Sequence, residues 1–204
     1  MGRKADVDRI VDAVESAEKQ TSAEFVVVLE PCSGSYRDID LLFAVGVNFI
    51  VMLIAFFSPI VVSPDWLPLN LILLFVLAWL FSAYTPFVKS LFCSSKRMER
   101  QAKEMAQLQF LNQNVTQTRG RTGIMVFVSQ LEKRVMVVAD SGVMRSVDDD
   151  NWIILMAEIQ DGFDKSDLSK TAVQAVEKLG EFLAKPLPVA EDDIDELSNI
   201  PSLH

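Results

Sequence analysis

The chain has 204 residues, a formal net charge of −9, and 50% hydrophobic residues. This acidic balance argues against a nucleic-acid-binding protein, which needs a basic surface. A single histidine, His204, excludes a His-rich zinc site and the triads and dyads that use a histidine base. The two cysteines, Cys32 and Cys93, are expected to be thiols in a reducing compartment, although a cysteine beside a membrane can also be palmitoylated.

Residues 1–40 are predicted to form the first part of a soluble domain. Apolar residues recur at helical spacing between Asp6 and Lys19, with charged residues on the opposite side. The run Glu24–Glu30 is a predicted strand that is apolar on both faces, so helices are expected to cover both of its faces.

Residues 41–88 are predicted to form a transmembrane helical hairpin with spans at 41–62 and 67–88. Asp65 is the only charged residue in this stretch, and it lies between Pro64 and Pro68, where the two spans must turn. At about 1.5 Å per residue, a helix of about 22 residues covers the roughly 30 Å core of a bilayer. A buried hairpin in a soluble protein is the alternative, but core helices of this length normally show a polar face.

Basic residues predict the orientation of the hairpin. Five basic residues follow the second span closely, Arg37 precedes the first span, and the loop around Asp65 has none. The positive-inside rule therefore places both termini and the soluble domain in the cytoplasm of a bacterial-type inner membrane, with the Asp65 turn outside. The lipid bilayer is thus an expected partner. The five residues are Lys89, Lys96, Arg97, Arg100 and Lys103.

Residues 89–184 are predicted to complete the soluble domain. A helix from Ser90 to about Val115 is expected to continue the second span, with Met98, Met105, Leu108, Leu111 and Val115 buried. Strands at 124–129 and 134–139 and helices at 148–160 and 167–183 follow, and residues 185–204 are expected to be an acidic, disordered tail. This order of elements predicts an α/β fold with a small mixed sheet between helices.

Three sequence elements resemble the TPM domain family, in particular its bacterial membrane proteins that carry a hairpin inside the domain. They are Thr21–Glu24 before a valine-rich strand, the run from Arg119-Gly120-Arg121-Thr122-Gly123 to Val143, and the segment 192–198. The resemblance implies an α/β/α sandwich, and either an acid phosphatase, a calcium-binding module or an accessory factor for membrane complexes. The sequence departs from the family at Ala139-Asp140-Ser141-Gly142-Val143, where members commonly carry a Gly-aromatic-Gly-Leu run.

Topology predicts one candidate site at the end of the sheet where the first two strands begin. If those strands are parallel, Asp140 lies at that end with Arg119 and Arg121, and the Asp148-Asp149-Asp150 run joins them. Asp140 and these three aspartates could ligate Ca²⁺ or Mg²⁺, and the two arginines could hold a phosphate. The same residues also suit plainer roles, as a helix cap, a turn and surface charges.

The sequence therefore leaves two main hypotheses for function. The first is an accessory, assembly or quality-control factor for a membrane complex, which contacts a membrane-protein partner through the hairpin. The second is a weak, divalent-metal-dependent phosphatase that uses Asp140, Arg119 and Arg121, or a calcium-binding module with the same aspartates and no turnover. Asn48, a strongly polar residue in the first span, is expected to hydrogen-bond between helices.

Overall fold

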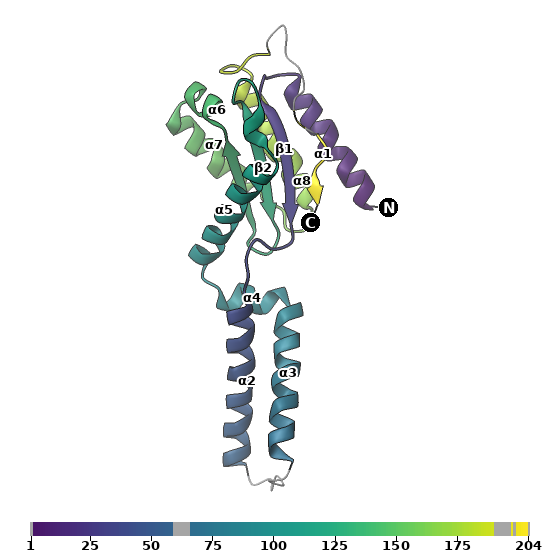
Figure 1. Cartoon of the computed structure of the whole chain (residues 1–204), viewed down its shortest axis with the longest axis vertical. Coiled ribbons are helices and arrows are strands. Elements are labelled where there is room, and N and C mark those ends of the chain that lie inside the picture. The colour runs from purple at the N-terminus through teal and green to yellow at the C-terminus, as the bar shows by residue number, and fades with distance from the viewer. Residues whose placement is uncertain (1, 59–65, 190–196, 198, 204) are drawn as a thin grey trace. The chain divides into compact units, whose positions relative to one another are not determined.

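A computed structural model of the chain describes residues 2–58, 66–189, 197 and 199–203 (Figure 1). The chain divides into two compact units, Gly34–Met98 and the remainder, Met1–Ser33 with Glu99–His204. The predicted turn at Asp65 and most of the acidic segment 190–198 lie outside the described residues.

The larger unit contains a four-stranded mixed sheet in the order β3-β2-β1-β4. Its strands are β1 (Glu24–Glu30), β2 (Gly123–Ser129), β3 (Arg134–Ala139) and β4 (Ser202–Leu203). β1 pairs in parallel with both β2 and β4, whereas β3 is antiparallel to β2. The three longer strands and the parallel pairing of the first two confirm the sequence prediction.

Helices cover both faces of this sheet, which gives three layers (Figure 1). On one face, Phe25 and Val27 of β1 pack with α1 (Gly2–Glu18), α7 (Asp149–Asp161) and α8 (Leu168–Leu183). On the other face, Val26 and Val28 pack with α5 (Ser95–Asn112). Because β1 and β2 are covered on both sides, nearly all of their residues are buried, as their continuous apolar runs predicted.

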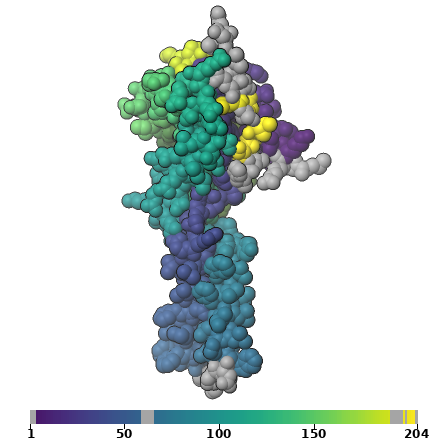
Figure 2. Space-filling model, viewed as in Figure 1, coloured from purple at the N-terminus to yellow at the C-terminus, as the bar shows by residue number. Residues whose placement is uncertain are grey.

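The smaller unit consists of α2 (Arg37–Phe57) and α3 (Leu67–Tyr84), which pack against each other, and the short helix α4 (Pro86–Phe92). By length and composition, α2 and α3 could each cross a membrane, and few of their residues are buried. The space-filling view shows their side chains facing outward along both helices (Figure 2). Apolar side chains that are exposed to this degree need a nonpolar environment or a partner.

The prediction of a continuous helix after α3 was wrong at two places, and one later helix was missed. The second span does not run into one long helix, because Thr85 precedes Pro86 and takes an extended conformation (φ −107°, ψ 104°). A second break separates α4 from α5 at Cys93, which is also extended. A short helix that the sequence did not predict, α6 (Ser141–Ser146), follows β3 directly.

The predicted buried stripe of α5 is wrong in the second half of the helix, whereas Met105 packs against the core in a partly buried position as expected. Met98 and Val115 are buried as expected, but Leu108 is 52% exposed and Leu111 is 65% exposed. The residues that pack against the sheet are Ala102, Ala106 and Phe110. At the C-terminus, where a disordered tail was predicted, Ser202 and Leu203 add the strand β4 beside β1.

Phe110 and Leu111, which are adjacent in α5, test which face of the helix is buried against the sheet. Phe110→Ala is expected to lower the free energy of unfolding by about 3–5 kcal/mol, because it empties a buried site against the sheet. Leu111→Ala is the matched control and should change it by less than about 0.5 kcal/mol. The measurement is urea denaturation of the full chain in detergent, and the opposite ranking of the two variants would contradict the packing.

Candidate functional site

The loop before β2 brings Arg121 to Asp140, as the predicted topology required. Arg121 has a left-handed backbone (φ 56°), and its Nε lies 3.2 Å from Oδ2 of Asp140. Asp140 is only 5% exposed and caps α6, since its Oδ1 accepts a hydrogen bond from the Ser141 N–H at 2.6 Å. Oδ2 has no aligned hydrogen-bond donor within the described part of the chain, so Arg121 holds it by charge.

Gly142 allows this loop to approach α6 closely. Its N–H donates to the Arg121 carbonyl at 2.9 Å, and a Cβ at this position would lie 2.3 Å from the Gly120 oxygen. No larger residue fits there unless the backbone moves. The Asp-Ser-Gly sequence after β3, in which the chain departs from the TPM pattern, therefore fixes the loop that carries Arg121.

The other predicted site residues lie at the surface. Asp148 caps α7 through the Asn151 N–H at 3.2 Å, and Asp148, Asp149 and Asp150 are all exposed. Arg119 is exposed as well. Across the described ranges, no group of three or more His, Cys, Asp or Glu side chains is placed to hold a metal ion. The described geometry thus supports capping roles for Asp140 and Asp148.

A buried carboxylate, in the tight turn between β2 and β3, lies at the end of the sheet opposite to Asp140. Glu132 is 4% exposed and accepts hydrogen bonds from the Ser33 N–H at 3.0 and 3.1 Å and from the Ser129 hydroxyl. The Ser33 hydroxyl in turn donates to Ser129 Oγ at 2.7 Å. Glu132 therefore ties the segment that leaves β1 to the end of β2.

The smaller unit contains a second buried polar group, the Asp40–Ser82–Lys89 cluster. The Ser82 hydroxyl donates to Asp40 Oδ1 at 2.6 Å, and Lys89 Nζ lies 4.0 Å from the same oxygen. Lys89 also donates to the Ala83 carbonyl at 2.7 Å. The cluster joins α2, α3 and α4 at one end of the helix pair. Asp40 and Lys89 lie just outside the predicted spans, and the sequence analysis used Lys89 only as one of the basic residues that follow the second span.

Asn48 does not make the predicted hydrogen bond between helices. Its side-chain amide donates to the Ala44 carbonyl at 3.2 Å, one turn earlier in α2. Within a helix this bond satisfies the polar side chain without a second helix. The polar contact between α2 and α3 is made instead by Asp40 and Ser82.

A hollow of about 560 Å³ lies at the carboxyl end of β1, where open α/β sheets commonly bind ligands. Its walls are formed by α1, residues 29–31, Gln130 and residues 165–169. Asp167, one of its acidic lining residues with Asp6 and Glu30, caps α8 through the Lys170 N–H at 2.7 Å and lies 3.4 Å from Arg9 Nη1. The nearby Asp164 has a pKa held below its ordinary 3.8, chiefly by the hydrogen bond from the Ser166 hydroxyl.

No family model matches this chain, and no curated protein matches it. Among solved structures, the chain is similar to the NMR structure of BA42 protein from the psychrophilic bacterium Bizionia argentinensis. The TM-score is 0.58 at 24% identity, and the similarity covers 98% of this chain and 93% of that one. At this identity the likeness concerns the fold.

Removing the Arg121 cation tests whether it holds Asp140. Arg121→Gln is expected to destabilise the chain by about 1–3 kcal/mol, because a buried carboxylate oxygen loses its compensating charge. Arg121→Lys keeps the charge and should recover part of that loss. Urea denaturation measures both variants, and equal stability of Arg121→Gln and the wild type would show that the ion pair contributes nothing.

The hydrogen bonds to Asp164 give a pH-dependent prediction. Because its folded pKa is lowered, they stabilise the fold above the unfolded pKa, and that contribution disappears as the pH falls through the folded value. NMR titration of the side-chain carboxyl carbon should give a pKa below 3.8 in the wild type. Ser166→Ala should move the pKa upward; an unchanged midpoint would assign the shift to another group.

Proposed function

We propose that this chain is a membrane-anchored, TPM-like protein that serves as an accessory, assembly or quality-control factor for a membrane complex. The helices α2 and α3 form a transmembrane hairpin inserted into an α/β/α domain, and both termini lie in the cytoplasm. The hairpin is the anchor and the surface that contacts a membrane-protein partner.

The observation that carries this proposal is the apolar exterior of α2 and α3. Large apolar side chains are exposed along both helices, including Phe56 at 82% and Leu73 at 56%. No charged residue occurs at 41–58 or 66–88. In hydrocarbon a helix satisfies its own backbone hydrogen bonds, so such a surface is stable there and costly in water.

The polar groups of the unit 34–98 also fit a bilayer. The Asp40–Ser82–Lys89 cluster lies where α2 begins and α3 ends, so its charges belong to the interface rather than to the hydrocarbon. Inside the hairpin, the Asn48 amide is satisfied by its own helix. These features support insertion of both helices.

The contacts of the Asp140 carboxylate favour the accessory role over catalysis. One of its oxygens accepts the capping hydrogen bond and the other faces Arg121, so both are already engaged. The run 148–150 is exposed and caps α7. These side chains have structural roles that account for their positions.

The second candidate remains the metal-dependent phosphatase or calcium-binding module. It is favoured by one observation, the contact between Asp140 and Arg121, two of its proposed site residues. Calorimetric titration of Ca²⁺ and Mg²⁺ into the full chain in detergent tests this candidate. Saturable binding that disappears in Asp140→Asn would support it, and no binding at millimolar metal would exclude both of its forms.

Replacing the hairpin separates anchoring from partner contact. A chain in which an unrelated two-span hairpin of equal length and orientation replaces residues 41–88 should remain in the membrane, because its apolar length is unchanged. It should lose the large assembly that the wild-type chain forms, because the contact surface is gone. Blue-native electrophoresis of solubilised membranes measures this assembly.

Asp140→Asn is the matched control for the hairpin replacement. It keeps the shape of the side chain, removes the charge of the candidate catalytic residue, and should leave the assembly intact. Two results together would show that the accessory role through the hairpin is wrong. The chain with the replaced hairpin would keep both the assembly and the biological activity of the protein, and Asp140→Asn would abolish that biological activity.

A further inference from the structure

An apolar hollow of about 350 Å³ lies along α2 beside α4, and one of its lining residues, Phe43, also stacks on Phe81 of α3 with 6.2 Å between the ring centres. It extends over residues 39–50 of α2, about 16 Å at the rise of an α-helix. Every lining residue is apolar or glycine: Ile39, Leu42, Phe43, Gly46, Val47, Ile50 and Phe92. The last of these belongs to α4, which forms one wall.

Gly46 makes the hollow deep at its middle. A Cβ built at this position would meet no atom within 4 Å, so the space beside the helix backbone is open. Leu42 and Ile50 lie one turn before and one turn after Gly46 on the same face. The result is an apolar trough that runs along the helix axis.

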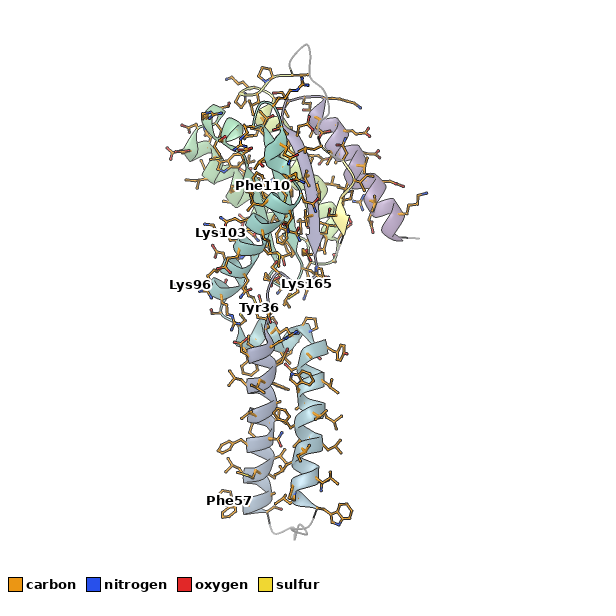
Figure 3. The ribbon with its side chains drawn as sticks, viewed as in Figure 1. Tyr36, Phe57, Lys96, Lys103, Phe110 and Lys165 are labelled. Atoms are coloured by element: carbon orange, nitrogen blue, oxygen red, sulfur yellow. The ribbon has the colours of Figure 1, made fainter. Side chains whose placement is uncertain are left out.

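Positive charge gathers at one end of this trough. Tyr36, one turn before the first lining residues, has the Arg97 guanidinium 5.5 Å from its ring centre, and Arg97 also bonds to Asp38. Tyr36 and Lys96 lie at the end of the unit opposite Phe57 (Figure 3). Arg97 is paired with Asp38 and Lys89 with Asp40, so the net positive charge of this end comes from Arg37 and Lys96, which are both exposed.

We propose that the trough binds one acyl chain of an anionic phospholipid, with the phosphate group near Arg37 and Lys96. This inference rests on the proposed insertion of the hairpin in a membrane. An apolar slot that ends at cationic side chains matches the two parts of such a lipid. A second copy of α2 packed in parallel would fit the slot less well, because it would bring two positive ends together.

Native mass spectrometry tests this proposal on the full chain reconstituted in vesicles of equal parts phosphatidylglycerol and phosphatidylcholine, then released in mild detergent. The wild-type chain should retain phosphatidylglycerol in preference to phosphatidylcholine. Gly46→Leu should lose the bound lipid, because its side chain fills the open space without a clash. Gly46→Ala removes the same glycine but fills little of the trough, and Val45→Leu adds bulk outside the lining; both should behave as the wild type.

The headgroup is tested separately by Arg37→Gln combined with Lys96→Gln, which should keep bound lipid but lose the preference for phosphatidylglycerol. Equal retention by Gly46→Leu and the wild type, or no preference in the wild type, would overturn the proposal. A dimer that Gly46→Leu dissociates, with no lipid bound, would assign the trough to a second copy. Alkaline carbonate washing of the same vesicles is the separate control: release of the protein would refute membrane insertion itself.

Discussion

The parallel pairing of β1 with β2 is the interaction on which the rest of the larger unit depends. It runs from Glu24 opposite Gly123 to Glu30 opposite Ser129, over seven residues in each strand. The two strands are far apart in the sequence, so the pairing joins the N-terminal segment to the chain that returns after α4. Because the two strands are parallel, the chain must cross to the other end of the sheet before β2 begins, and α5, which packs on the sheet, lies in that crossover.

Buried polar groups fix the ends of this arrangement. Glu132 holds Ser33, where the chain leaves the larger unit, and Asp40 holds Ser82, where α3 ends. Burying a carboxylate costs free energy unless its hydrogen bonds are satisfied. The Glu132 and Asp40 carboxylates are therefore each compatible with only a narrow range of local backbone geometries. At the other end of the sheet, Asp140 does the same for the loop that carries Arg121. In the proposed account these acidic residues position the backbone. The outer surface of the hairpin makes the proposed contacts with lipid and with a membrane-protein partner.

The sequence predicted the strands well because β1, β2 and β3 are short apolar runs bounded by clear turn residues. It failed at α5, where Leu111 matches the apolar periodicity as well as Phe110 does, and tertiary packing alone selects between them. Of the candidate site, the meeting of Asp140 and Arg121 followed from strand topology. The buried state of Glu132 could not be inferred, because a charged residue in a tight turn is normally exposed.

The central claim is that α2 and α3 cross a membrane as a hairpin, with the larger unit in the cytoplasm. The most direct test is labelling of single cysteines by a membrane-impermeant maleimide in right-side-out and inside-out vesicles, on a chain carrying Cys32→Ser and Cys93→Ser. Trp66→Cys, which lies at the start of α3 and is 63% exposed, should be labelled only from outside, and Lys103→Cys of α5 only from the cytoplasmic side. Labelling of both positions from the same side would contradict the account.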